Sequence, residues 1–493
     1  MDLGFLIEIG ETLAYPEVVF VIYALILLKL KFSSQIRLQN DSMKLENSST
    51  WGVSISLTCN WMLQGGFFIL LSKSYSFGPL FLFISCGQEI SLLLIGYFIL
   101  PKLGTINKLS FTHLIAENYG GKVLAITKLA NIVSSCGIIS IQLFVCCLLI
   151  AAPCGITSYL NKVIIVTIIS IAFLIYSTMN IFGKNALSFF KNIPIIQISG
   201  ILFTLLTIVN FIPFMSLYYQ NIVKDILQYT LYNINLDILI NNFWFLSSVC
   251  FVYLFYYMIP NIFDPFFQQI ILKEKVSNVK KAINRTIIQM IIMKLMISFV
   301  TMFIYIISKA STIPIHENNV LAFLIDMFSD RVGVPILYPI LLIISCIIWN
   351  IVNRVELICA LWERDIHYPV RKVSVSVKCS FFLLIFAATT YIKYSEFCFL
   401  ERLIKCNLLL YVAVLPIFFL TLLGFRKSTK TALRSMLFGL LTYFLCIIFL
   451  PSSFNGVLTP LSILIGMLFN GLYFFAAPNK DGGIEKPKYL STD

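Results

Sequence analysis

The chain has 493 residues, of which 59% are hydrophobic and only 12% are charged, and its mean hydropathy is +0.91. A soluble domain is roughly 45–50% apolar and about 25% charged, and one core cannot bury so large an excess, so a soluble fold is excluded. The net charge of +13 would suit nucleic acid or anionic partners, but its distribution along the chain argues for another origin.

The apolar residues come in blocks of about twenty, the length that an α-helix needs to cross the hydrocarbon core of a bilayer. The first eleven residues, MDLGFLIEIGE, are acidic where a secretory signal would be basic, so we expect no cleavable signal. In chain order the predicted spans are 14–31, 51–71, 78–100, 123–152, 162–182, 189–214, 241–260, 286–308, 334–360, 374–392, 403–424, 432–450 and 457–477.

The loops between these spans alternate in charge. One set holds 25 of the 36 basic residues and the other holds eight, while Lys128, Lys294 and Arg354 lie within spans. Because basic loops stay in the cytoplasm, the alternation predicts an all-α polytopic membrane protein with about 13 transmembrane helices. Its N-terminus is outside and its C-terminus cytoplasmic. The abundance of Ile, Phe, Asn and Lys is typical of an AT-rich genome, which favours a bacterial source. We therefore expect the membrane to be a bacterial cytoplasmic (inner) membrane.

Segments outside the spans are short. The longest on the outer side, near 215–240 and 310–333, hold about twenty-five residues each, too few for a soluble catalytic domain. The sequence has no phosphate-binding glycine loop, no HExxH and no CxxC. We therefore predict no enzyme activity, no metal site of His and Cys, and no disulfide framework. Any function has to reside within the helices.

Polar groups inside the second span interrupt its apolar character. Asn60, Gln64 and the pair Gly65–Gly66 fall near the middle of the membrane. Adjacent glycines weaken a helix, and opened backbone carbonyls coordinate cations in broken-helix transporters. The alternative is that the glycines only allow two helices to approach closely.

The third span carries Gln88 and Glu89 about halfway through. A carboxylate at this depth is protonated, paired, or in contact with a water-filled path. Lys128, Lys294 and Arg354 lie nearer the cytoplasmic ends of their spans, and we expect their side chains to extend to the interface.

Several fragments appear in the order typical of a known family. The chain resembles the sodium/solute symporter family, whose members carry proline, pantothenate, choline and sugars. The resemblance runs over roughly residues 50–445. Its fragments are SLTCNWMLQGGFF at 56–68, the stretch 99–128 with an aromatic-Gly-x-Lys signature, SIQL at 140–143, the Gln- and Lys-rich loop 266–285, ERDIH at 363–367, and the Pro-containing helix with its basic turn at 415–442.

The resemblance implies a leucine-transporter-like core of five-plus-five inverted-repeat helices, with substrate and ion near the midplane. It divides the chain into an N-terminal extra helix with its loop (1–50), a first repeat (51–215), an extracytoplasmic loop (216–240), a second repeat (241–425), two C-terminal helices (426–477) and a cytoplasmic tail (478–493).

The same resemblance assigns a sodium site, and sodium is the only cofactor it implies. Backbone carbonyls at Cys59, Met62 and Cys346 would be ligands, and the family's two hydroxyl ligands fall on Trp349 and Asn350. Sodium requires oxygen, and the Trp349 indole offers none. The resemblance assigns the substrate region to Gly65, Gly66, Ser85, Gln88, Ser247 and Ser248.

These features predict a secondary active transporter of a small polar metabolite, either an amino acid or a quaternary amine. Alternating access of a four-helix bundle against a scaffold would be driven by a sodium or proton gradient, with Glu89 as candidate proton carrier. The alternatives are a non-transporting sensor with the same fold and, ranked last, a flippase for lipid-linked sugars. The expected partners are the substrate and the lipid bilayer, with no nucleic acid and no obligate protein partner.

Overall fold

The computed structural model describes residues 50–61, 70–71, 74–75, 85–101, 111–151, 276–310, 347, 351, 354, 407–449 and 458–477. These residues are helical apart from short turns, and no strand occurs among them. The helices are α3 (Thr50–Trp61), α6 (Gly87–Leu94) continued by the π-helical η2 (Ile95–Ile99), α8 (Phe111–Ala151), α14 (Val276–Ala310), the π-helical η6 (Leu410–Val414) continued by α19 (Leu415–Leu422), α20 (Thr429–Phe449) and α21 (Leu458–Ala476).

Each of these helices falls on a predicted span. The largest difference is at the start of α14, which begins at Val276, about ten residues before the predicted span 286–308. Its added turns are polar and basic, so hydropathy marks only the apolar part of a longer helix. Helix α8 begins at Phe111, but a break at Gly120 divides it, and its long part begins close to the predicted span 123–152. The predicted spans 14–31, 162–182, 189–214, 241–260 and 374–392 lie outside the described residues, as does nearly all of 334–360.

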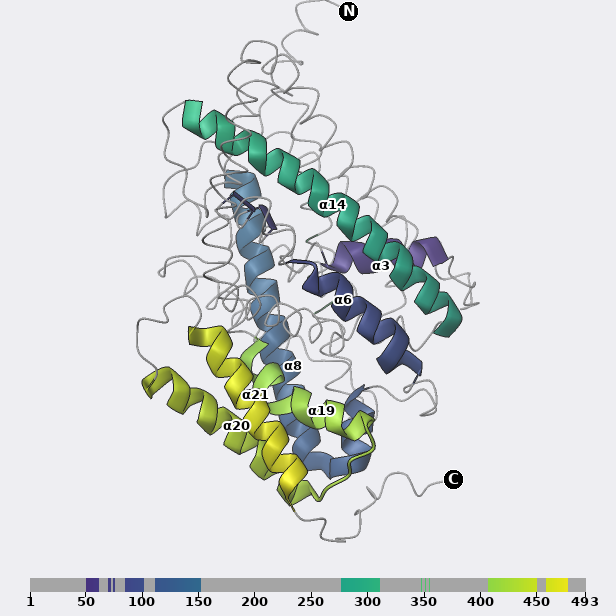
Figure 1. The fold of residues 1–493 in the computed structure, drawn as a ribbon, viewed down its shortest axis with the longest axis vertical. Coiled ribbons are helices and arrows are strands. Elements are labelled where there is room, and N and C mark those ends of the chain that lie inside the picture. Colours follow the sequence, from purple (N-terminus) through teal and green to yellow (C-terminus); the bar gives the residue numbers. More distant parts are fainter. Residues whose placement is uncertain are drawn as a thin grey trace, which may run out of the picture.

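The described helices pack in two groups. In one group, α14 packs on α3, α6 and η2; in the other, α20, α21, α19 and η6 pack on one another and on α8 (Figure 1). Helices α3, α6 and α14 are the second, third and eighth predicted spans. The number of 13 spans and the inverted repeats stay predictions.

Two of the described helices are long and apolar enough to cross a membrane, Asn118–Cys146 and Thr429–Phe449. Helix α20 also exposes large apolar side chains along most of its length. A contiguous exposed apolar surface of this kind is unusual for a soluble monomer and suits a helix that faces lipid. The exposed side chains of α20 include Leu437, Leu441, Phe444, Leu445, Ile448 and Phe449.

The aromatic-Gly-x-Lys signature forms a bend inside α8. Gly120 adopts φ +74°, outside the helical region, and separates a short first helix from the long one. Just before it, the buried Tyr119 ring packs edge-on against Phe474, and its hydroxyl lies 2.6 Å from the hydroxyl of Thr421. The tyrosine thus ties the bend to α19 and α21, while the glycine permits the turn.

Substituting Gly120 by Ala is expected to destabilise the protein by about 1–2 kcal/mol, because a Cβ is unfavourable at positive φ. Space is not the cause, since the nearest atom to the added methyl, Thr429 Oγ1, is 4.0 Å away. Gly121→Ala is the matched control: it is helical with open space around it and should be neutral or stabilising. Thermal unfolding of the purified variants measures both, and equal melting temperatures would contradict the expectation.

A side chain of α21 stabilises the η6–α19 segment at the point where the regular helical hydrogen bonds are interrupted. Pro416 has no N–H, so the carbonyl of Val412, four residues earlier, loses its usual donor. The buried Asn470 of α21 replaces it, donating from Nδ2 to the carbonyls of Val412 at 2.6 Å and Ala413 at 3.0 Å. Glycines at 439 and 466 leave room for this contact: a Cβ on Gly439 would lie 2.7 Å from Asn470 Cβ.

Candidate functional site

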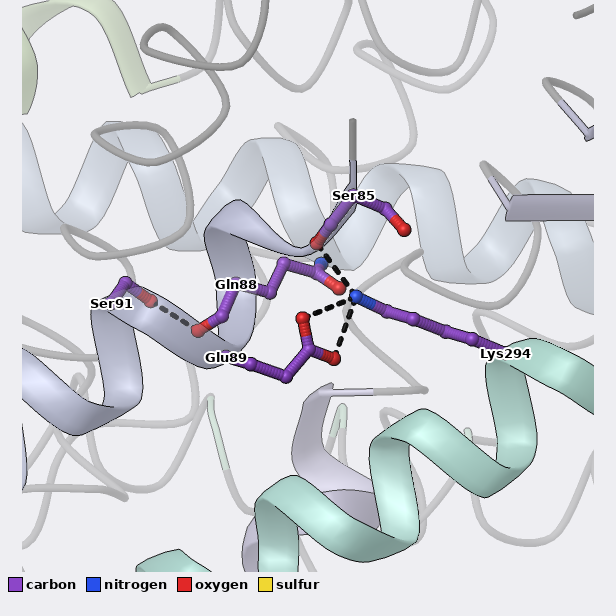
Figure 2. Close-up of polar contacts among 5 residues, drawn as sticks. All are labelled: Ser85, Gln88, Glu89, Ser91 and Lys294. Carbon is purple, nitrogen blue, oxygen red and sulfur yellow. Dashed lines mark hydrogen bonds and ion pairs between the residues drawn. The ribbon is translucent and has the colours of Figure 1, made fainter. Parts of the chain in front are cut away.

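A buried ion pair joins the two helices α6 and α14. Lys294 projects from the middle of α14 toward the first turn of α6, where Glu89 lies (Figure 2). Its ammonium nitrogen is 2.7 Å from Glu89 Oε1 and 2.7 Å from Oε2. The two residues are 205 positions apart in the chain and are both buried, with Lys294 3% and Glu89 6% exposed.

The main chain just before α6 provides a further contact to the ammonium. Lys294 Nζ also donates to the carbonyl oxygen of Ser85 at 2.6 Å, just before α6 begins at Gly87. The carbonyl of Gln88 is occupied separately, by the hydroxyl of Ser91 at 2.7 Å. Lys294 is therefore held by one carboxylate and one carbonyl of the same helix end.

The amide of Gln88 lies beside this pair without a partner of its own. Gln88 is 1% exposed, and neither Nε2 nor Oε1 has a hydrogen bond in the structure. A buried amide without partners costs about 1–3 kcal/mol. An unpartnered buried amide beside an ion pair indicates that a bound ligand supplies the missing hydrogen bonds.

The pair has no net charge, yet its two partners are expensive to bury. Removing two ions from water costs several kcal/mol each, and their attraction recovers this only in good geometry with additional hydrogen bonds. A buried ion pair is therefore weak evidence for stability. Within a bilayer, such a pair more often marks a substrate or ion pathway.

Three of the residues singled out from sequence lie together here: Ser85, Gln88 and Glu89. Of the three states expected for Glu89, the structure shows the paired one. Its partner Lys294 was expected to reach the interface, and that expectation is wrong because the side chain is buried against Glu89. The same expectation fails for Arg354, which is 4% exposed, whereas Lys128 is half-buried.

The other expected site residues are not tested by this geometry. Cys59 lies in the last turn of α3, where only its backbone is described. The remaining substrate and sodium positions lie outside the described residues: Gly65, Gly66, Ser247, Ser248, Met62, Cys346, Trp349 and Asn350. Within the described ranges, no three His, Cys, Asp or Glu side chains lie close enough to hold a metal ion.

Sequence reasoning missed Lys294 as a member of the site. A usable signal was present, because a lone lysine in an apolar span and a lone carboxylate in another are natural partners. What the sequence lacks is any indication that the eighth predicted span contacts the third.

Comparison with known proteins supports the fold. No protein-family model matches the chain, and no curated protein matches it. Solved structures do match, among them a Na⁺-coupled sialic acid symporter in a substrate-bound, outward-open state, with a TM-score of 0.64 and 13% sequence identity. The match covers 88% of this chain and 91% of the symporter. The chain therefore shares the helical fold of this symporter over most of its length.

Proposed function

We propose that this protein is a secondary active transporter of a small polar metabolite and a divergent member of the sodium/solute symporter family. Three observations support the proposal: the fold shared with a Na⁺-coupled symporter, the family's fragments in their expected order, and a polar centre buried between α6 and α14. The membrane is a bacterial inner membrane, with the N-terminus outside.

The Glu89–Lys294 pair and the Gln88 amide form the centre at which the substrate binds. The observation that carries this assignment is the buried Gln88 amide, which has no partner in the structure. A substrate with both donors and acceptors can satisfy it while exchanging hydrogen bonds with the pair. Gly65, Gly66, Ser247 and Ser248 would complete the site from the second and seventh predicted spans.

The charge balance of the centre narrows the substrate class. Glu89 and Lys294 cancel, so a quaternary amine gains no net attraction, and its nitrogen has no N–H to offer Gln88. A zwitterionic amino acid can pair its carboxylate with Lys294 and its ammonium with Glu89. We therefore favour a substrate without net charge, with an amino acid ahead of a quaternary amine.

The coupling ion is either sodium or a proton. In the proton version Glu89 is the carrier, and it must release Lys294 when it binds the proton. Glu89→Gln cannot carry a proton, so its residual uptake should lose the pH dependence of the wild type. An unchanged pH profile in uptake by proteoliposomes would exclude Glu89 from this role.

A second function is supported by one observation. The family's two hydroxyl ligands for sodium fall on Trp349 and Asn350, as expected for a sensor that has kept the fold but lost ion coupling. A sensor binds its ligand without accumulating it. Accumulation of substrate in proteoliposomes against its gradient would exclude this alternative.

Replacing Gln88 by Leu tests the site directly. The variant removes an unpartnered buried amide, so the ligand-free protein should become more stable, by about 1–3 kcal/mol. Ligand binding should weaken at least about tenfold, because the contacts to the amide are lost. The measurement is the melting temperature against a panel of amino acids, betaines, choline and sugars, since a ligand that binds the folded state stabilises it.

The matched control for Gln88→Leu is Thr127→Val on α8. Thr127 is buried and its hydroxyl donates within its own helix, to the carbonyl of Val123 at 3.0 Å, so this variant should keep the wild-type ligand response. A Gln88→Leu variant that binds the same ligand equally well would refute the proposed site. If no compound in the panel stabilised the wild type or entered proteoliposomes, the transport proposal itself would fail.

A further inference from the structure

One side of α20 changes from basic to apolar along the helix. The residues on this side recur every three or four positions, as neighbours on one face of an α-helix do. They are called here the basic–apolar face and comprise Lys430, Arg434, Leu437, Leu441, Leu445 and Ile448. All six are exposed, and the four apolar ones are each at least 51% exposed. Helix α20 lies on the outer side of its group, beside α21 (Figure 1), and no described helix covers this face.

The two basic residues of the face lack a counter-charge. Residues 407–449 and 458–477 contain four basic residues and no acidic one. Of the four, Lys427 donates to the carbonyl of Ala477, at the end of α21, whereas no hydrogen bond or ion pair joins Lys430 or Arg434 to a described residue. Lys430 also lies in the first turn of α20, where the helix dipole disfavours a cation, and that turn has no acidic residue. A bound anion would compensate both charges.

The start of α14 shows the other way in which such cations are satisfied. Lys280 lies over the Tyr97 ring, 5.4 Å from its centre, and the Arg285 guanidinium lies 4.9 Å from the centre of the Trp51 ring. The expected cytoplasmic side accounts for positive charge at both helix starts. It does not account for two unpartnered cations that lie in register with an exposed apolar stripe. That register calls for a ligand with an anionic head and an apolar tail.

We propose that the basic–apolar face of α20 binds an anionic phospholipid, with the phosphate of the headgroup at Lys430 and Arg434 and an acyl chain along the four apolar side chains. An arginine guanidinium pairs with phosphate through two parallel hydrogen bonds, and a lysine adds a point charge. Basic clusters next to a membrane-spanning helix attract anionic headgroups in this way. Lipid binding of this kind does not depend on the transport function proposed above.

The length of the apolar part matches an acyl chain. From Leu437 to Ile448 the helix rises about 16 Å, and one leaflet of the hydrocarbon core is about 15 Å thick. A free phosphate would contact only the two cations and leave this stripe unused. The combination of charge and length therefore selects a phospholipid over a soluble anion.

The test is native mass spectrometry of the detergent-purified protein with phosphatidylglycerol or with phosphatidylcholine of the same acyl chains. The wild type should bind the anionic lipid at least about tenfold more tightly than the zwitterionic one. Lys430→Gln/Arg434→Gln should reduce this preference below about threefold, and Lys430→Arg/Arg434→Lys, which keeps both charges, should retain it. The anionic lipid should also raise the melting temperature of the wild type more than phosphatidylcholine does. Both positions are exposed, so the variants should fold normally.

Lys281→Gln is the matched control for the single variant Arg434→Gln. Each removes one exposed basic side chain from a helix, but Lys281 lies on α14, in the other group of helices. The control should keep the wild-type preference, whereas Arg434→Gln should lose part of it.

Three results would overturn the inference. The first is a wild type that binds both lipids equally, or a double glutamine variant that keeps the preference. The second is stabilisation by glycerol phosphate equal to that by the anionic lipid, which would indicate a site for a soluble anion. The third is a dimer in the mass spectrum that the double glutamine variant dissociates, since a second copy of the chain would then cover this face.

Discussion

Replacing Lys294 by Met is expected to abolish uptake and to lower the free energy of unfolding by about 3–5 kcal/mol, because Glu89 is left as an unpaired buried carboxylate. Glu89→Gln should also destabilise the protein, since it leaves the Lys294 ammonium without its charged partner, and it should leave at most a residual uptake that no longer depends on pH. The cost is large because both groups are almost fully excluded from solvent. Thermal unfolding of the purified variants, together with uptake by proteoliposomes, measures the two effects separately.

The double variant Glu89→Gln/Lys294→Met distinguishes a functional pair from a structural one. Neutral replacements of a buried ion pair are often as stable as the original, so the double variant should recover most of the stability lost in each single variant. Uptake should not recover. The control is Lys281→Met: this exposed lysine of α14 should change stability by no more than about 0.5 kcal/mol. A fully active double variant would show that the pair only positions the helices.

The second large effect is expected at Gly439, where α20 crosses α21 and η6. A methyl group on this residue would lie 2.9 Å from the carbonyl oxygen of Gly466 and 3.2 Å from that of Val412, as well as against Asn470 Cβ. Backbone atoms cannot move aside as a flexible side chain can. Gly439→Ala should therefore cost about 3 kcal/mol and weaken the contacts of Asn470 with the interrupted helix.

Gly471→Ala is the matched control on the facing helix. Its added methyl would meet only Pro416 Cβ, at 3.8 Å, which is ordinary van der Waals contact. Alanine favours the helix over glycine by about 1 kcal/mol, so this variant should be slightly more stable than the wild type. The two substitutions should shift the melting temperature in opposite directions. Equal shifts would show that the close approach at Gly439 can relax at little cost.

The local elements were predictable because they depend on near neighbours in the chain. Helices α20 and α21 fall within three residues of the predicted spans 432–450 and 457–477, since the length of an apolar block sets a membrane-spanning helix. The start of α14 was placed too late, because hydropathy carries no information about polar turns that extend beyond the apolar block. The bend at Gly120 and the anchoring of Tyr119 were not predicted, because they depend on a backbone conformation and on contacts with distant helices.

The candidate site could be predicted only in part. Gln88 and Glu89 were recognisable because polar groups inside an apolar span are costly and stand out. Lys294 is conspicuous for the same reason, but its side chain was predicted to extend to the membrane interface. The sequence gives its position only relative to the end of its own helix and not relative to Glu89.

The sequence by itself determined that the chain is helical and apolar, because these properties follow from the length of the apolar blocks and the cost of unpaired backbone groups in lipid. The orientation that the basic loops indicate stays a prediction. Only the tertiary structure decided which polar groups meet. The pairing of Glu89 with Lys294, the contact of Tyr119 with Thr421, and the close approach at Gly439 each join residues from separate helices. Such contacts depend on how helices pack in three dimensions, and no local pattern of residues specifies that.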